Sequence, residues 1–328
     1  MEEKNIEVLF NWLDESTEVI TKHEDEPYLD GLGVALEVLF YEQATNTMDD
    51  ELAALMNQSL KNININECSP QEIRKAVQLA IIKGMQRSTQ SQHLMTPESI
   101  ALLMSYFIEK LMSEQTNLRI FDPVVGTGNL LTTVMQRLNN VEAAYGSEVD
   151  NTLIQLALYN ANLQKLNVEL FHQDSLRPFL LDPVDVVVGD LPVGYYPDDI
   201  QASNFDLKAK EGHSYAHHLM IEQSLYYTKE SGYLFFLVPE FLFDSDQADQ
   251  LNAFIHKHAH IIGLVRLPET AFSSKNNVKS ILILQKKGEQ TKDPNEPLLV
   301  NMPSLSNVAA MEDITNQMNN WFLSYKNE

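Results

Sequence analysis

Four stretches of this sequence end an apolar run with an acidic residue, a pattern typical of ligand sites in α/β proteins. The first is 120-IFDPVVGTGNLLTTV-134, in which Asp122 ends the run and a glycine-rich turn follows. The others are 145-YGSEVD-150, 172-HQDSLRP-178 and 186-VVVGDLPVGYYPDD-199. Because the carboxyl ends of parallel strands meet at one edge of a sheet, these stretches predict a single binding site.

The glycine turn of the first stretch predicts close approach of a ligand to the backbone. Gly126 and Gly128 can adopt positive φ, and a helix that begins near Asn129 presents free N–H groups. The turn is not a phosphate loop, since no Gly-Lys-Ser/Thr follows, and Leu131 stands where a dinucleotide fingerprint has its third glycine. The alternative is an ordinary tight turn between a strand and a helix.

Two further acids follow this turn in an informative order. Glu148 lies twenty residues after Gly128, where a carboxylate can accept hydrogen bonds from a ribose diol. Asp174 ends the third predicted strand and can accept from an exocyclic amine such as adenine N6. Each acid taken singly is typical of a turn or helix cap, whereas the three features together favour a nucleoside site.

These stretches require a parallel sheet covered by helices. A helix is expected from 96-TPE-98, with Thr96 as N-cap, and after it short apolar strands alternate with amphipathic helices. The strands are predicted near 118–122, 142–147, 168–172, 184–189, 232–238, 261–267 and 278–285, and the helices at 129–139, 151–165, 215–230 and 246–258. No helix separates the last two strands, which are therefore expected to pair antiparallel. The predicted fold class is α/β, with a doubly wound, mostly parallel, Rossmann-like seven-stranded sheet that has an antiparallel edge strand.

Residues 1–90 differ from the rest of the chain. Apolar residues recur there at three- and four-residue spacing, which predicts a small all-α domain of about four helices. Polar residues 86–93 are expected to link it to a second domain, residues 91–328, which ends in a helix near 309–324.

Composition limits the classes of partner. The 328 residues carry a net charge of −23, which is the wrong sign for a protein that grips duplex DNA alone. Residues 256–287 are an exception, with six Lys or Arg against Glu269. A single cysteine, an acidic start unlike a signal peptide and no apolar run long enough for a bilayer predict a cytoplasmic protein without membrane contact.

The motifs together resemble those of class I S-adenosylmethionine-dependent methyltransferases. They are most similar to the N6-adenine DNA methyltransferases, especially the modification subunits of type I restriction systems. The resemblance covers residues 90–290 and rests on 94-LMTPESIALLM-104, 122-DPVVGTGNLL-131, 146-GSEVD-150, 173-QDSL-176, 189-GDLPVGYY-196 and 266-RLPETAFSSKNNVKSILILQKK-287. The acidic helical domain has a looser counterpart in the same group.

This resemblance implies a cofactor site for S-adenosylmethionine. Thr96 and Asp122 would hold the amino or carboxyl end of its methionine part, Glu148 the ribose and Asp174 the adenine amine. The full set of implied cofactor contacts is Thr96, Asp122, Val124, Gly126, Gly128, Asn129, Glu148, Val149, Asp174, Ser175 and Asp190.

The resemblance also identifies 190-DLPV-193 as the catalytic loop, which reads Asp/Asn-Pro-Pro-Tyr/Phe in that group. Asp190 keeps the side-chain acceptor for a substrate amine, Leu191 keeps a backbone carbonyl, and Pro192 keeps part of the rigidity. Leu191 replaces the first proline and adds an N–H that needs a partner. Val193 replaces the aromatic residue that stacks on a flipped base, which weakens a base pocket.

Tyr195 or Tyr196 is expected to supply the missing ring, unless both tyrosines pack at the base of the loop. The implied catalytic residues are then Asp190, Leu191, Pro192 and Tyr195. The histidines of 213-HSYAHH-218 have no cysteines at zinc spacing, so no metal site is predicted.

The predicted function is methyl transfer to an amino nitrogen, with adenine N6 in DNA as one acceptor and a non-DNA substrate as another. No segment beyond residue 290 is long enough to read a DNA sequence, so specificity would need a partner subunit. A catalytically degenerate module that binds the cofactor for regulation or interaction is the alternative. A nicotinamide-dependent dehydrogenase is disfavoured by Leu131 and by the antiparallel strand pair.

Overall fold

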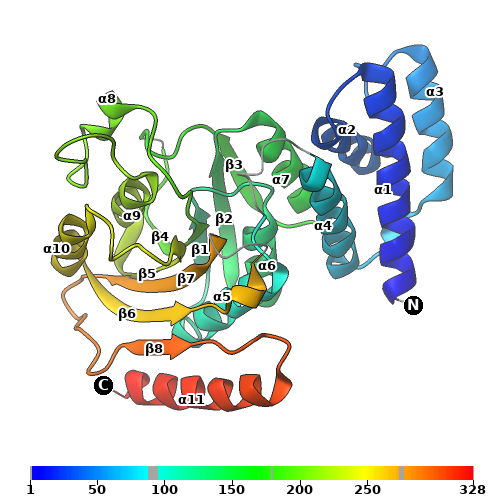
Figure 1. The fold of residues 1–328 in the computed structure, drawn as a ribbon. Helices are drawn as coiled ribbons and strands as arrows, with labels where there is room; N and C mark the ends of the chain where they lie inside the picture. The colour runs from blue at the N-terminus through cyan, green and yellow to red at the C-terminus, as the bar shows by residue number, and fades with distance from the viewer. Residues whose placement is uncertain (1, 88–94, 179, 273–276, 328) are drawn as a thin grey trace.

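The computed structural model describes residues 2–87, 95–178, 180–272 and 277–327 (Figure 1). Most of the expected link at 86–93, including the predicted boundary at residue 90, falls outside these residues, so the division into two domains stays a prediction. Helices α1 to α4 lie together on one side of the molecule, and the α/β part lies on the other (Figure 1).

The helical part is built from α1 (Glu2–Glu24), α2 (Tyr28–Tyr41), α3 (Asp50–Ser59) and α4 (Pro70–Arg87). Its core contains Leu13, Leu36 and Val77, and it continues into the α/β part through Leu156 and Tyr159. The two parts are therefore joined by a shared apolar layer. The buried Arg74 guanidinium of α4 adds polar contacts to the Glu98 carboxylate at 2.5 Å and the Thr133 hydroxyl at 3.1 Å.

In the described residues, eight strands form one sheet in the order β3-β2-β1-β4-β5-β7-β6-β8. Their bounds are β1 (Leu118–Asp122), β2 (Val141–Glu148), β3 (Val168–His172), β4 (Val184–Asp190), β5 (Thr228–Pro239), β6 (Ala259–Arg266), β7 (Lys279–Lys286) and β8 (Leu298–Asn301). Strands β1 to β5 pair in parallel, whereas β7 is antiparallel to both β5 and β6. The predicted α/β class and the antiparallel pairing of the last two predicted strands are confirmed.

Two features of the sheet were not expected from the sequence. An eighth strand, β8, pairs in parallel with β6 and forms the edge. It has four residues, which is too short for a periodic pattern. The predicted helix at 215–230 ends at Tyr226, and residues 228–230 belong to β5 instead.

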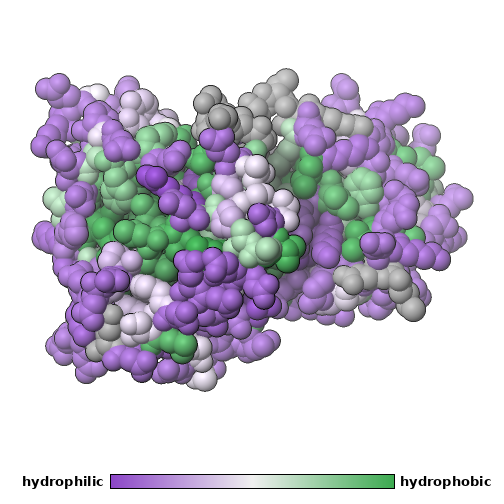
Figure 2. All heavy atoms as spheres, turned by 60° about the horizontal axis from the view of Figure 1, so that its bottom comes forward, coloured by the Kyte–Doolittle hydropathy of each residue, from purple (hydrophilic) through white to green (hydrophobic). Residues whose placement is uncertain are grey.

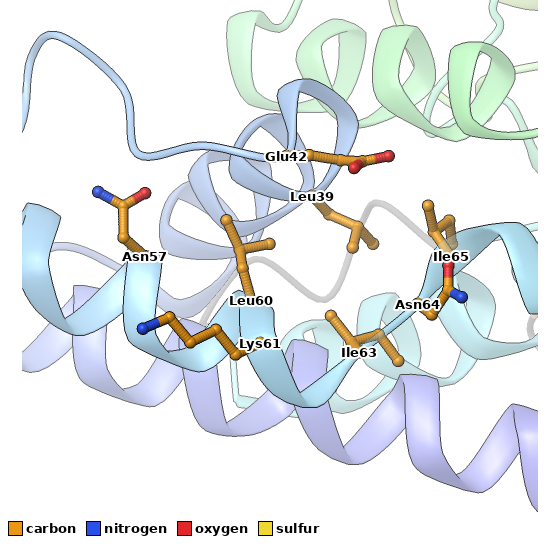
Figure 3. Close-up of a pocket in the computed structure, with 8 residues that line it drawn as sticks. All are labelled: Leu39, Glu42, Asn57, Leu60, Lys61, Ile63, Asn64 and Ile65. Atoms are coloured by element: carbon orange, nitrogen blue, oxygen red, sulfur yellow. The ribbon is translucent and has the colours of Figure 1, made fainter.

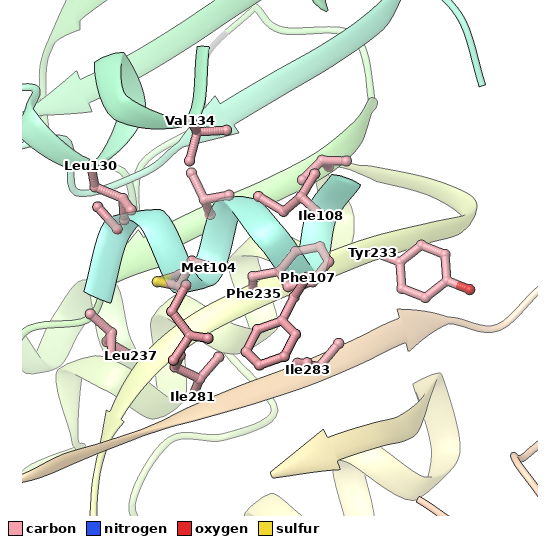
Figure 4. Packing of buried hydrophobic residues seen from close by; sticks show 14 of the residues in the cluster. Met104, Phe107, Ile108, Leu130, Val134, Tyr233, Phe235, Leu237, Ile281 and Ile283 are labelled. Atoms are coloured by element: carbon pink, nitrogen blue, oxygen red, sulfur yellow. The ribbon is translucent and has the colours of Figure 1, made fainter. Parts of the chain in front are cut away.

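Helices cover both faces of the sheet. They are α5 (Glu98–Leu111), α6 (Asn129–Arg137), α7 (Asn151–Leu163), the short α8 (Asp199–Ala202), α9 (Ala216–Tyr226), α10 (Ala248–His258) and α11 (Val308–Lys326). On one face, Phe107 of α5 packs with Phe235 of β5 and Ile283 of β7 (Figure 4). On the other face, Phe236 belongs to a cluster with residues of α9 and α10. The central strands are thus buried on both sides, as their continuous apolar runs predict.

The surface is mixed in character. Seen from the side of α11, apolar residues gather over the middle of the α/β part, and hydrophilic residues cover its edges and much of the helical part (Figure 2). No helix in the described residues is long and apolar enough to span a bilayer.

Candidate active site

The strand order reverses between β1 and β4, which are adjacent although β2 and β3 lie between them in sequence. Crevices for ligands form at such points, beyond the carboxyl ends of the strands. Apart from Thr96, which lies just before α5 (Glu98–Leu111), the predicted site residues belong to the tips of β1, β2, β3 and β4 and to the segments that follow them. We call the tips of β1 to β3 the donor side and the loop after β4, residues 190–196, the acceptor side.

Asp122 ends β1 and is buried. One carboxylate oxygen accepts from the Val124 N–H at 3.0 Å, and no cation lies within ion-pair distance among the described residues. Burial raises the pKa of Asp122 to about 8; the Val124 N–H opposes this shift, and the charges of Asp190 and Glu148 add to it. Asp122 is therefore largely protonated at neutral pH.

The two glycines after Asp122 have different roles. Gly126 has φ of +53°, and a Cβ placed there would have only the Val124 carbonyl oxygen nearby, at 4.0 Å, so its backbone is available to a ligand. Gly128 has φ of +78°, and a Cβ there would lie 3.3 Å from Ala157. Gly128 thus allows α7 to pack closely, and the face open to a ligand belongs to Gly126.

Glu148 at the tip of β2 is held by three backbone N–H groups. One carboxylate oxygen accepts from Gly126 at 3.0 Å, and the other accepts from Val149 at 2.9 Å and Asp150 at 3.0 Å. The side chain of Val149 is 68% exposed beside it. The acid is fixed before any ligand arrives, and its oxygens keep lone pairs for further donors.

Asp174 follows β3 and is fixed in a similar way. It accepts from the Leu176 N–H at 2.9 Å and from the Tyr196 hydroxyl at 2.5 Å. Burial and the neighbouring Asp174 raise the pKa of Tyr196, which keeps its hydroxyl a donor. The buried Ser175 hydroxyl donates to the Pro123 carbonyl at 2.5 Å, so this side chain ties the tips of β3 and β1 together.

Thr96 connects the start of α5 to the acceptor side. Its hydroxyl donates to Asp190 at 2.8 Å, and its carbonyl accepts from the Asn129 side chain at 2.7 Å. The expected N-cap role of Thr96 is wrong, because α5 begins at Glu98 with Pro97 in the cap position and the hydroxyl is committed to Asp190.

In the loop after β4, Leu191 has a backbone N–H that a proline would lack, and this N–H has a hydrogen-bond partner. Its N–H donates to the Leu237 carbonyl of β5 at 3.0 Å, and its side chain is fully buried. Pro192 and Val193 are exposed, with Val193 at 50%. The loop is therefore anchored by a backbone bond and core packing where the related loops use proline.

Lys279 was not predicted as a site residue. Its ammonium donates to the Asp190 carboxylate and to the Leu191 carbonyl, the latter at 3.1 Å. A signal was present in the sequence, since Lys279 precedes the buried run of β7 within the basic segment 256–287. Nothing in that signal indicated which acid it would contact.

The two tyrosines of the loop separate in the structure. Tyr196 is buried and bonded to Asp174, whereas Tyr195 is 57% exposed and stacks on Tyr215, with ring centroids 4.8 Å apart and an interplanar angle of 19°. Of the two rings, only that of Tyr195 is open to an incoming molecule.

His217 and His218 are fully buried at the start of α9, and their ring nitrogens have no hydrogen-bond partner among the described residues. Burial lowers the pKa of His217 to about 3 and that of His218 to about 4, so both are neutral at ordinary pH. His217 lies near the Pro192 carbonyl and Lys279. The described residues contain no cluster of three or more ligands for a metal.

A cavity elsewhere in the molecule is separate from this site. It measures about 240 Å³ and lies in the helical part (Figure 3). Its lining residues are Leu39, Glu42, Asn57, Leu60, Lys61, Ile63, Asn64 and Ile65. None of these belongs to the sheet.

The strand order and the four acidic strand tips are those expected of a class I methyltransferase fold. Residues 81–320 match the family model described as "N-6 DNA Methylase", and residues 7–85 match the one described as "YtxK N-terminal helical domain". The chain therefore belongs to the N-6 DNA methylase family, within the S-adenosylmethionine-dependent methyltransferases. The family predicted from the motifs is confirmed.

Relatives match nearly the whole chain. The uncharacterized protein YtxK of Bacillus subtilis is 42% identical, over 99% of this chain and 100% of its own length. A solved candidate class I S-adenosylmethionine-dependent methyltransferase from Listeria monocytogenes is 42% identical, with a TM-score of 0.92 over 97% of this chain and 99% of that one. A modification subunit of a candidate type I restriction enzyme from Vibrio vulnificus shares the fold, with a TM-score of 0.67, 17% identity, and coverage of 87% of this chain and 65% of that one.

Proposed function

We propose that this protein binds S-adenosylmethionine on the donor side and transfers its methyl group to an amino nitrogen held on the acceptor side. The observation that supports this most is the bond from Thr96 to Asp190, which brings the start of α5 to the β4 tip. Because the Thr96 carbonyl also accepts from the Asn129 side chain after β1, Thr96 links the donor side to the acceptor side.

The donor side suits a nucleoside with a charged amino-acid end. Gly126 leaves open space beside its backbone, and Glu148 presents fixed carboxylate oxygens to a ribose diol. Asp174 would accept from the adenine amine, and buried Asp122 would face the methionine end. Val124, Gly128, Asn129, Val149 and Ser175 complete the proposed contacts by shaping or flanking the glycine turn and the two acids.

On the acceptor side, a carboxylate and a carbonyl would hold the two hydrogens of the substrate amine. S-adenosylmethionine, when bound, supplies a methyl group on a sulfonium, which an amine lone pair can displace. Asp190 and the Leu191 carbonyl would draw that lone pair out of a conjugated base, and Pro192 would keep the two oxygens in place. Alignment of this kind contributes a large part of the rate in a direct transfer.

The substrate class that we propose is an adenine-like amine, with Tyr195 as the exposed ring on which it stacks. The net charge of −23 opposes tight binding to duplex DNA alone, so recognition of DNA would rest on a partner subunit. An acceptor other than DNA agrees better with this charge. Cytoplasmic location stays a prediction.

A second candidate is a module that binds the cofactor without transferring the methyl group. It is favoured by Val193, an exposed aliphatic residue where the related loops have an aromatic one, and by the engagement of Asp190 by Lys279. The donor side is the same in both proposals.

One pair of measurements tests the proposal. Calorimetric titration with S-adenosylmethionine should give a binding isotherm, and NAD should give none. Tritiated donor incubated with the protein and DNA, RNA or lysate protein should label one acceptor class, with Asp190→Ala as the matched inactive control. No binding of the donor contradicts both candidates, whereas binding without label supports the second.

A further inference from the structure

The ammonium of Lys279 lies at the place where the acceptor side should hold its substrate. Lys279 begins β7, which is separated from β4 by β5, so its side chain reaches across one strand to the β4 tip. It contacts the Asp190 carboxylate and the Leu191 carbonyl together. The side chains of Lys279 and Asp190 are each only 18% exposed.

These two oxygens are the same pair that would accept the two N–H groups of a substrate amine. An ammonium is itself a tetrahedral N–H donor, so it reproduces the hydrogen bonds of the substrate nitrogen. The second oxygen of Asp190 accepts from Thr96 at 2.8 Å. The carboxylate is therefore engaged on both oxygens by residues of the protein itself.

The charges favour the Lys279 ammonium over a neutral substrate amine at this position. A neutral amine would also donate to the Asp190 carboxylate, but the Lys279 ammonium adds an attraction between opposite full charges that the neutral amine lacks. The low exposure of the pair also limits screening by solvent. A neutral aromatic amine entering this site gains weaker bonds than those it must break.

We propose that Lys279 occupies the amine subsite as an internal competitor and that it determines which substrates enter. The inference rests on the proposed function of Asp190 and Leu191. A substrate gains access only when its other contacts, such as stacking on Tyr195, supply enough free energy to displace the ammonium. Amines that lack such contacts are excluded, which protects the donor from adventitious acceptors.

The position of Lys279 is tested without turnover. Acetylation of the folded protein, followed by mass spectrometry of peptides, should modify Lys279 at least about tenfold more slowly than the exposed Lys257. Asp190→Ala should remove this protection. Addition of S-adenosylhomocysteine with an adenine-rich single-stranded oligodeoxynucleotide should also speed the labelling of Lys279. Equal labelling of Lys279 and Lys257 in the wild type overturns the inference.

The consequence for transfer is tested with Lys279→Met, which keeps the length of the side chain and removes the ammonium. Methyl transfer from tritiated donor to the same oligonucleotide should rise at least about tenfold, with donor affinity changed less than threefold. Lys279→Arg should stay as slow as the wild type, because it keeps both charge and donors. Lys286→Met is the matched control at the far end of β7, where the ammonium bonds the Leu225 and Thr228 carbonyls.

The failures of the two proposals are distinguishable. If Lys279→Met is folded by circular dichroism and binds the donor but transfers no faster than the wild type, Lys279 is not a competitor. Lys279→Gln, which removes the charge but keeps an amide donor, decides the case if the methionine variant does not fold; the absence of any gain in transfer overturns the inference. If neither the wild type nor the variants bind the donor, the proposed function fails, while the labelling rates still report where Lys279 lies.

Discussion

At the tips of β2 and β3, Glu148 and Asp174 accept hydrogen bonds from backbone N–H groups one or two residues further along the chain. At the tip of β4, Asp190 is bonded instead by the side chains of Thr96 and Lys279, 94 and 89 residues away. The donor side is thus organised mainly by local turns, and the acceptor side by the assembled fold. A change on the donor side should alter binding of the nucleoside, and a change on the acceptor side should alter transfer.

The largest effect should come from Asp190→Ala. The substitution removes one of the two acceptors for the amine, and loss of one such preorganised group costs about 100-fold or more in rate. Donor affinity should change less than about threefold, since the donor side is held by other bonds. Transfer kinetics and calorimetry measure the two quantities. A collapse of donor affinity would show that Asp190 serves the donor side.

Glu148→Ala should have the next largest effect, and it should act on donor binding. It removes the acceptor for a ribose diol and leaves the N–H groups of Gly126, Val149 and Asp150 without their partner. Loss of such bonds costs about 1–3 kcal/mol, or roughly 5- to 150-fold in Kd. Glu142→Ala, an exposed acid on the same strand, is the control and should leave Kd unchanged. Equal effects of the two substitutions would remove Glu148 from the site.

The buried Asp122 predicts a pH dependence of stability. Its pKa is raised from 3.8 to about 8, so between these values the folded state holds a proton that the unfolded state releases. The free energy of unfolding contributed by this group therefore falls as pH rises, by up to about 1.4 kcal/mol per pH unit. Asp122→Asn lacks this slope and should gain in Tm relative to the wild type from pH 5 to 8. Parallel Tm profiles of the two proteins would contradict the shift.

Tyr195→Ala should give the smallest effect and should be confined to the acceptor side. Loss of one stacking ring costs about 1 kcal/mol or somewhat more, which raises the KM for an adenine acceptor about tenfold. Tyr196→Phe is the complementary variant, because it removes the hydroxyl that donates to Asp174. It should weaken binding of the methyl donor and leave the KM for the acceptor unchanged. If both variants changed only the KM for the acceptor, or only the Kd for the methyl donor, the separation into a donor side and an acceptor side would not hold.

Much of this molecule was predictable from local patterns. The strands that precede Asp122, Glu148, Asp174 and Asp190 were found because apolar runs stop at acids. β8 was not predicted because a strand of four residues is too short to show a periodic pattern. Thr96 was wrongly predicted as an N-cap because the capping rule considers only neighbouring residues, whereas its hydroxyl bonds the distant Asp190 carboxylate. Errors of both kinds arise where a partner far along the chain decides the outcome.

The sequence by itself determined the fold class and the order of the acidic strand tips, since hydrophobic periodicity and turn chemistry act over a few neighbouring residues. The family followed from the resemblance of its motifs to those of known methyltransferases. Tertiary structure alone decided that Tyr195 and not Tyr196 has an open ring, that the Leu191 N–H pairs with Leu237, and that Lys279 contacts Asp190. Those outcomes depend on which strands become neighbours in the sheet. A side chain on β7 meets the tip of β4 only after β5 has been placed between them.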